Sequence, residues 1–207
     1  QCMPRITHTV RGKTRILECS LPDHVSAFER IRELFHDDPS CVVDVIAHRY
    51  VHPGTVFFRT TRLSPRTLTM LRTTLDLAPL HNPFCYALSE RSCEVFRQVP
   101  NYVVFDTSFH RTIPRELATY PLPARLLKRL KLRKVGFHGI SHQYVMQEAC
   151  RFLQRPISTQ KVISCHLGTG GSSVCAIEQG RSINNSMGFT PLEGLVMNTR
   201  SGNLDSG

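Results

Sequence analysis

Hydrophobic and polar positions follow two different periods along this chain. Apolar residues at helical spacing predict helices over residues 23–35, from Ser64 to Leu75 and from Asn82 to about Gln98. Short apolar runs rich in β-branched residues predict strands over 41–47, 55–59, 102–106, 161–166 and 173–177. Because such strands alternate with helices, the predicted fold class is α/β.

Capping residues mark where helices begin and end. Ser64-Pro65 predicts an N-cap with proline in the first turn, and Asp37-Asp38-Pro39 predicts the end of the first helix. Ser141 is expected to cap a helix that reaches Phe152. Thr190-Pro-Leu-Glu193 has the form of a capping box and predicts a last helix.

A polar linker near residues 154–161 separates the helix after Ser141 from a glycine-containing hairpin. We expect a domain boundary in this linker. The chain would then consist of an N-terminal domain over residues 1–154 and the start of a second domain over residues 155–207.

The composition fits a folded, basic protein. The chain has 207 residues, of which 41% are hydrophobic, and 26 Lys and Arg against 16 Asp and Glu give a formal net charge of +10.

The densest basic stretch, residues 125–134, has no aromatic residues to stack on bases. We interpret it as a solvated helix face with Leu126, Leu127 and Leu130 packed inward, and expect no nucleic-acid partner. No run approaches the ~18 apolar residues of a membrane span, so no membrane partner is expected.

Eight cysteines and ten histidines raise the questions of disulfides and zinc. No Cys-x-x-Cys pair occurs, and we expect free thiols in a reducing, cytoplasmic compartment, with a disulfide framework as the weaker alternative. Three cysteines lie in apolar runs, as buried thiols do: Cys41, Cys165 and Cys175. The pairs His48/His52 and His138/His142 have Gly or Pro beside them, and no cysteine pair completes a zinc site. We predict no metal ligand within this chain.

Polar residues suited to binding anions lie in loops that follow strands or precede helices. Ligands of α/β sheets bind beyond the carboxyl ends of the strands. Arginine and histidine side chains there suit an anionic substrate and a phosphoryl group in transfer. Each residue taken singly could also have a structural role. The residues are Arg49, His81, Asp106, His138, His166 and Arg200.

The segment His166–Ser173 is a glycine-rich turn between two predicted strands. Glycines let backbone N–H groups approach phosphate oxygens closely. No Gly-Lys-Ser/Thr follows, which excludes a Walker loop, and the next element is a strand, which excludes a dinucleotide-binding fingerprint. A strand–turn–strand unit that holds phosphate is typical of actin-like and sugar-kinase-like ATPase domains. An ordinary hairpin turn is the alternative.

Six motifs together give the chain a resemblance to the acetate kinase family. They follow the order and nearly the spacing of that family over residues 41–207, whereas residues 1–40 match poorly. The motifs are His48-Arg-Tyr-Val-His-Pro-Gly54, Ala78-Pro-Leu-His-Asn-Pro83, Phe105-Asp-Thr-Ser-Phe-His110, Gly136-Phe-His-Gly-Ile-Ser-His142, His166-Leu-Gly-Thr-Gly170 and Ser186-Met-Gly-Phe-Thr-Pro-Leu-Glu-Gly194 with Thr199-Arg-Ser-Gly202.

The resemblance implies an actin-like ATPase, or ribonuclease H-like, fold. One nearly complete domain would lack its first strand, and the start of a truncated nucleotide-binding domain would follow it. The implied reaction is reversible phosphoryl transfer from ATP to the carboxylate of acetate, giving acetyl phosphate and ADP. It would use Mg²⁺, whose ligands would lie mostly outside this chain. The full-length protein would be a homodimer, and the 207-residue chain alone would be inactive.

The resemblance also assigns roles to individual residues. Arg49 and Arg200 would hold the substrate carboxylate and the phosphoryl group, His138 would hydrogen-bond that group, and Asp106 would act as acid/base or orient the nucleophile. The catalytic residues would thus be Asp106, His138 and Arg200. The substrate-binding residues would be Arg49, Val51, Leu80, His81, Phe137 and Pro191. Of these, Val51, Leu80, Phe137 and Pro191 would form an apolar pocket for the methyl group. The residues in contact with nucleotide phosphates would be His166, Leu167, Gly168, Thr169 and Gly170.

The chain departs from the family pattern at four places. Pro53-Gly54 stands for Gly-Gly, Thr169 for Asn and Asn198 for Gly, and one residue is inserted at Gly171 or Ser172. We expect these changes to alter the reaction rate and the nucleotide affinity more than the fold.

Two alternatives to an acetate kinase stay open. One is a kinase for propionate or another short-chain carboxylate, since one methylene changes discrimination by only ~1–3 kcal/mol. The other is a catalytically dead fragment.

Overall fold

The computed structural model describes residues 3–36, 42–205 and 207. These residues form helices and three sheets, which confirms the predicted α/β class. The first sheet is a hairpin of β1 (Arg5–Val10) and β2 (Lys13–Glu18), which turns at Arg11 and Gly12, both with positive φ. This hairpin is not among the predicted strands, because both of its strands are largely exposed and neither contains a long apolar run.

The second sheet has a parallel pair of strands at its centre. β3 (Ile46–Tyr50) pairs in parallel with β5 (Asn101–Phe105), and the short β4 (Thr61–Arg62) pairs antiparallel with the other side of β5. Buried aromatic and aliphatic side chains connect this sheet to the neighbouring helices. They are Tyr50, Phe57, Leu63, Leu71, Val103 and Phe105.

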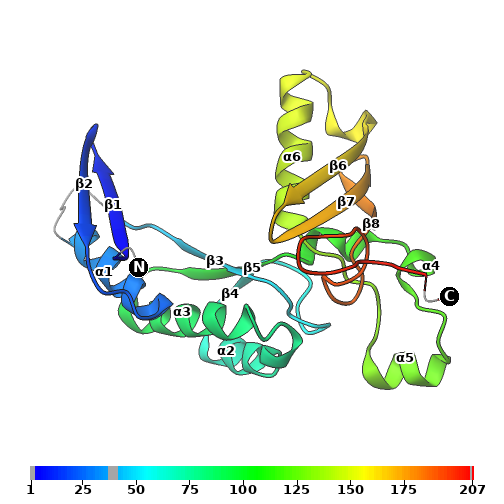
Figure 1. Ribbon diagram of the computed structural model, residues 1–207, viewed down its shortest axis with the longest axis horizontal. Helices are drawn as coiled ribbons and strands as arrows, with labels where there is room; N and C mark the ends of the chain where they lie inside the picture. The colour runs from blue at the N-terminus through cyan, green and yellow to red at the C-terminus, as the bar shows by residue number, and fades with distance from the viewer. Residues whose placement is uncertain (1–2, 37–41, 206) are drawn as a thin grey trace.

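Three helices pack together beside the second sheet. They are α1 (His24–His36), α2 (Pro65–Arg72) and α3 (Asn82–Val95). In Figure 1, α2 and α3 lie below the sheet, and α1 lies to its left under the β1–β2 hairpin. Ser64 caps α2 as predicted: its hydroxyl accepts a hydrogen bond from Thr67 N–H, and the Thr67 hydroxyl accepts one from Ser64 N–H. The proposed stop of the first helix at 37–39 lies outside the described residues.

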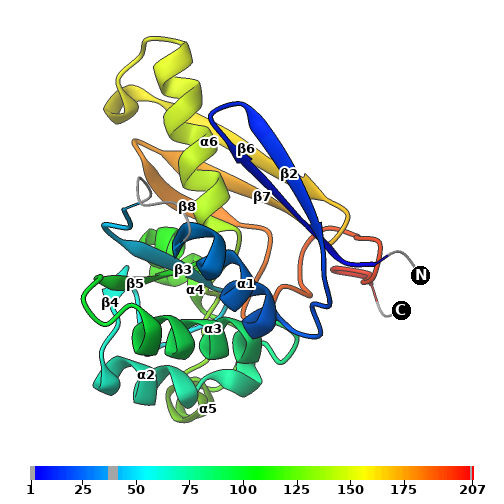
Figure 2. The same ribbon diagram turned by 90° about the vertical axis from the view of Figure 1, so that its left-hand side faces the viewer.

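The third sheet is an antiparallel meander of β6 (Lys161–Gly168), β7 (Gly171–Glu178) and β8 (Arg181–Asn185). It confirms the predicted strands 161–166 and 173–177 and the glycine turn between them. α6 (Gly139–Phe152) packs on β6, as Figures 1 and 2 show. Alternate residues of β7 are buried on this side, which gives the sheet one inward face.

Short elements connect the second and third sheets. They are η2 (Ser108–Thr112), α4 (Arg115–Ala118) and α5 (Ala124–Leu130), with the single turns η1 (Leu75–Leu77) and η3 (Ile157–Thr159) elsewhere in the chain. α6 precedes residue 154 but packs on β6, which follows it. The division into domains 1–154 and 155–207 stays a prediction.

One predicted strand is displaced, and another is wrong. Residues 42–45 are not a strand and β3 begins only at Ile46, so Arg49 lies on the strand instead of in a loop; Cys41 is outside the described residues. Residues 55–59 form a turn-rich segment in which only Phe57 is buried. The apolar run there supplies one core residue and does not pair with a neighbouring strand.

Two predicted helix starts are also wrong. The residue before α6 is His138 in a left-handed conformation, and Ser141 lies inside the helix, where its hydroxyl contacts His166. Residues 190–193 form turns, because Glu193 accepts hydrogen bonds from Phe189 N–H and the Tyr120 hydroxyl across the loop. Glu193 therefore closes this loop and does not cap a helix.

The basic stretch is only partly helical. α5 ends at Leu130, whose side chain is 50% exposed and so is not packed inward as predicted, whereas Leu126 and Leu127 are half-buried. Six cysteines in the described part of the chain are free thiols, and Cys165 is exposed although its run is apolar. No helix among the described residues is long and apolar enough to cross a membrane.

Candidate active site

The site begins where β3 and β5 end. These strands are parallel and Arg49 lies opposite Val104, so their carboxyl ends meet at one edge of the sheet. Arg49 Nε lies 2.9 Å from Asp106 Oδ1, and Arg49 Nη2 lies 2.7 Å from Asp106 Oδ2. The Asp106 side chain is 2% exposed and the Arg49 side chain 59%. The buried carboxylate therefore anchors a guanidinium that still faces solvent, and this hydrogen bond raises the pKa of Arg49.

A tight backbone contact places His138 beside this ion pair. Gly139 N–H donates to the Asp106 backbone oxygen at 2.8 Å, and His138 has φ of +58°. A Cβ at Gly139 would lie 2.4 Å from that oxygen, so only glycine allows the approach. The start of α6 is thereby fixed against the end of β5.

Burial keeps the His138 ring neutral near pH 7. Its Nδ1 lies 2.9 Å from Ser173 Oγ, and the ring stacks on His166 with centroids 4.1 Å apart. Burial is the main cause that lowers the pKa of His138 to about 4; His166, Arg49 and Arg200 lower it further, and Asp106 opposes them. His138 is thus within electrostatic reach of residues from four distant parts of the sequence.

Arg200 connects the glycine turn to the segment that follows β8. Its Nη1 donates to the Pro191 carbonyl and its Nη2 to the Gly170 carbonyl, both at 2.8 Å. The structure therefore gathers five of the residues singled out by sequence around one polar cluster. They are Arg49, Asp106, His138, His166 and Arg200.

The structure does not bring all the residues assigned to substrate binding together. Val51 and Phe137 belong to one buried cluster and are 5% and 1% exposed. Leu80 is 79% exposed and His81 is exposed in the loop before α3, so the structure does not place them in that cluster. Pro191 is half-buried and joins the site through its carbonyl contact with Arg200.

The turn between β6 and β7 is open to an approaching anion. Leu167 is 74% exposed, and Gly168, Thr169 and Gly170 are exposed as well. A Cβ at Gly170 would meet no atom within 4 Å. Phosphate oxygens could therefore come close to this stretch of backbone without a steric clash.

Sequence reasoning missed a second layer of polar residues behind His138. Ser173, His142 and Ser164 are buried and connected to one another and to His138 by hydrogen bonds. His110 is buried too and contacts Ser182 Oγ at 2.8 Å. The period-2 pattern of β7 would have placed Ser173 on its inward face, but a single serine there gives no sign of its histidine partners.

Comparison with known proteins decides the family. A model of the acetokinase family matches residues 4–207. The chain belongs to the acetokinase family. The match begins at residue 4 and so includes most of the first 40 residues. The expectation that the resemblance is confined to residues 41–207 was therefore wrong. The β1–β2 hairpin is part of the matched region.

Acetokinase relatives agree with this assignment. The chain is 42% identical over 197 residues to the acetate kinase of Dictyoglomus turgidum, covering 92% of this chain and 48% of that protein. It is 40% identical over 207 residues to the acetate kinase of Thermoanaerobacter pseudethanolicus, covering 97% of this chain and 51% of that protein. The chain thus spans about half the length of these relatives.

Solved structures confirm the predicted fold. The acetate kinase of Entamoeba histolytica superimposes with a TM-score of 0.88 at 35% identity, and a propionate kinase of Francisella tularensis with 0.86 at 34% identity. Each match covers 98% of this chain and 52% of the other. The chain therefore has the actin-like ATPase fold of the acetokinase family.

The described residues do not fit a magnesium site. No group of three His, Cys, Asp or Glu side chains within 3–36, 42–205 and 207 is arranged to hold a metal ion. Asp106, the carboxylate at the centre of the cluster, has both oxygens engaged by Arg49. Asp106 therefore offers no free carboxylate oxygen to Mg²⁺, which prefers oxygen ligands.

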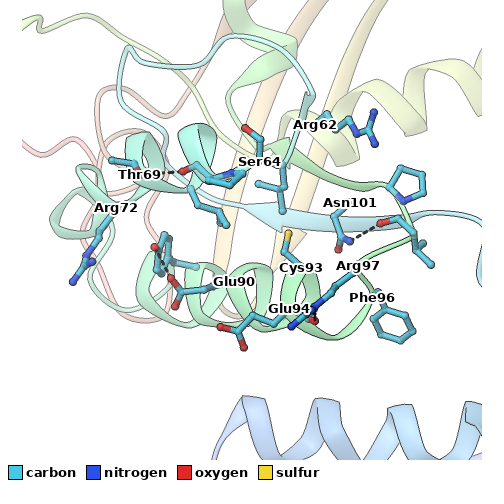
Figure 3. Close-up of a pocket in the computed structure, with 16 residues that line it drawn as sticks. Arg62, Ser64, Thr69, Arg72, Glu90, Cys93, Glu94, Phe96, Arg97 and Asn101 are labelled. Atoms are coloured by element: carbon cyan, nitrogen blue, oxygen red, sulfur yellow. Dashed lines mark hydrogen bonds between the residues drawn. The ribbon is translucent and has the colours of Figure 1, made fainter.

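A separate groove of about 650 Å³ lies between α2, α3 and the start of β5. Figure 3 shows arginine and glutamate side chains around it, with Cys93 between the labelled side chains of the two helices. Its lining includes Arg62, Arg72, Glu90 and Arg97, and none of the five clustered residues. The groove is thus distinct from the candidate active site of the acetokinase chain.

Proposed function

We propose that this chain forms the carboxylate- and phosphoryl-binding side of an acetate kinase. The reaction is transfer of the terminal phosphoryl group of ATP to a carboxylate oxygen of acetate. A new P–O bond forms at that oxygen, and the bond between the phosphorus and ADP breaks; the reverse reaction uses the same groups. The single observation that carries the proposal is the convergence of Arg49, Asp106 and Arg200 around His138 in an acetokinase fold.

The geometry supports a positioning role for Asp106. Acetate is ionised at neutral pH, because carboxylic acids have pKa values near ~4. Its oxygen needs no general base, so the main barrier is repulsion between two anions. Asp106 holds Arg49 with two hydrogen bonds, and the exposed side of that guanidinium is left to pair with a carboxylate or phosphoryl oxygen.

His138 and Arg200 supply the rest of the charge stabilisation. A neutral imidazole donates a hydrogen bond without adding repulsion against the two arginines. Arg200 is held by two carbonyl oxygens, one of them in the glycine turn, so it lies beside the segment proposed to contact nucleotide phosphates. Donors fixed in advance where negative charge develops are the largest contribution in many enzymes.

ATP and ADP are the proposed nucleotides, with the exposed turn His166–Gly170 at their phosphates. Bound Mg²⁺ would neutralise phosphate charge, with ligands outside the described residues. Val51 and Phe137 would close the pocket for the acetate methyl from the protein interior. The free thiols suit a reducing compartment, and we propose a cytoplasmic location.

Steady-state kinetics of the complete gene product test this function. We expect acetyl phosphate formation from ATP and acetate, and a fall in kcat/KM of about 100-fold or more in Arg49→Ala and in Arg200→Ala. Arg66→Ala, at an exposed position of α2, is the matched control and should leave the rate unchanged. Unchanged rates in both site variants would remove the residue assignment. The kcat/KM ratio for acetate over propionate decides between the two substrates.

A further inference from the structure

Four side chains form an unbranched chain of hydrogen bonds that ends at His138. Ser164 Oγ lies 2.9 Å from His142 Nδ1, and His142 Nε2 lies 2.8 Å from Ser173 Oγ. Ser173 Oγ in turn lies 2.9 Å from His138 Nδ1. Ser164 is 3% exposed, and His142 and Ser173 are 0% exposed, so water does not reach the first three members.

This chain holds one proton more than it has hydrogen bonds. Both histidines are neutral near pH 7, since burial lowers the pKa of His138 to about 4 and that of His142 to about 3. Each hydroxyl and each neutral imidazole then carries one polar proton, so four protons serve three contacts. The surplus proton lies on Ser164 Oγ, on Ser173 Oγ or on His138 Nε2. With the proton on Ser164 or Ser173, His138 carries its own proton on Nδ1; only the third arrangement places it on Nε2.

Burial decides among the three positions. Within the described residues, Ser164 Oγ has no hydrogen-bond partner other than His142, and Ser173 Oγ has none other than the two histidines. A surplus proton on either buried serine would therefore be a buried donor without an acceptor. His138 Nε2 is at the half-buried end, beside Gly171, and is free to meet water or a ligand. The favoured order is therefore Ser164 donating to His142, His142 to Ser173, and Ser173 to His138.

We propose that Ser173, oriented by His142, is a positioning residue that holds His138 in the tautomer with its proton on Nε2. The proposal rests on the proposed function, because this tautomer presents a donor to the phosphoryl group. The opposite tautomer would present a lone pair to an anion. Ser173 does not touch the reacting atoms and acts only through the His138 ring.

Nitrogen-15 NMR of the histidine-labelled 207-residue chain at pH 7 tests this directly. Correlation of the ring carbons' protons with both ring nitrogens shows which nitrogen carries the proton. We expect the Nε2–H form of His138 to exceed the Nδ1–H form about tenfold or more in the unchanged chain, given the cost of a buried unsatisfied donor. In Ser173→Ala the two forms should become comparable, and Ser173→Thr, which keeps the hydroxyl, should restore the excess.

The neighbouring Ser172→Ala is the matched control, because its hydroxyl contacts the Gly168 carbonyl and not a histidine. It should leave the His138 tautomer unchanged. A proton on Nδ1 of His138 in the unchanged chain, or an unaltered tautomer in folded Ser173→Ala, would overturn the proposal. If Ser173→Ala does not fold, the unchanged chain and Ser173→Thr still decide it. The measurement needs no turnover, and a separate titration with inorganic phosphate reports whether the His138 Nε2–H meets an anion, which tests the proposed function alone.

Discussion

The second and third sheets meet at the candidate site and differ in the charge of the side chains that they contribute. At the ends of β3 and β5, a buried carboxylate is paired with a guanidinium that remains exposed. On the inward face of β6 and β7, histidines and serines are connected by hydrogen bonds, and burial lowers the pKa values of the histidines. One side therefore presents a guanidinium held in place by a carboxylate, and the other holds a donor that stays neutral.

This difference matters for an anion bound between the two sides. A third positive charge, at His138, would repel Arg49 and Arg200, both of which lower the pKa of its ring. A neutral imidazole avoids that repulsion and can still donate a hydrogen bond. The site thus concentrates its charge in the arginines and its directional donor in the histidine.

Removing the carboxylate of the Arg49–Asp106 pair should give the largest effect on activity. In Asp106→Ala, Arg49 loses both of its carboxylate contacts and becomes mobile at the surface, so we expect kcat/KM to fall about 100-fold or more in the complete gene product. The folded state should lose little, because the freed guanidinium is already 59% exposed. Steady-state kinetics and thermal unfolding check the two statements separately.

Asp106→Asn separates the shape of the carboxylate from its charge. The amide keeps one acceptor for the guanidinium, so this variant should fall between the unchanged protein and Asp106→Ala. Equal activity in all three proteins would show that Arg49 does not need its partner.

These two sides also differ in how far the sequence predicts them. Arg49, Asp106 and the glycine turn stand out because each follows an apolar run, and strand ends in an α/β fold collect ligands. Ser173 and His142 do not stand out in the sequence, because the hydrogen bond that gives them a role joins residues 31 positions apart. The loop at 190–193 was mispredicted for a related reason, because the Glu193–Tyr120 hydrogen bond, a contact distant in sequence, overrides the local capping pattern. The β1–β2 hairpin was missed because neither of its strands contains a long apolar run.

The neutral side should make stability depend on pH. Burial lowers the folded-state pKa of His138 and His142 below the ordinary value of 6.5, so their stabilisation is complete above pH 6.5 and is lost as pH falls towards 4. Each such histidine contributes a slope of up to about 1.4 kcal/mol per pH unit in the free energy of unfolding. Urea unfolding of the 207-residue chain between pH 6.5 and pH 5 measures this slope.

His142→Gln is the variant that isolates the contribution of the neutral side. It removes one titrating group while keeping a polar side chain, so the slope between pH 6.5 and pH 5 should become shallower. A slope that stays as steep in His142→Gln would contradict the assignment of the effect to the buried histidines.

The smallest expected effect comes from Gly171, which follows the glycine turn and lies against the His138 ring. A Cβ at Gly171 would lie 3.2 Å from His138 Cε1 and 3.3 Å from its Nε2, so Gly171→Ala forces the ring to move by a few tenths of an ångström. We expect a cost of about 1 kcal/mol, which corresponds to a fall in Tm of about 2–4 °C, together with shifted ring resonances of His138. Gly170→Ala is the control, since a Cβ there meets no atom within 4 Å. Equal shifts in both variants would show that the turn, and not contact with His138, responds to the added methyl group.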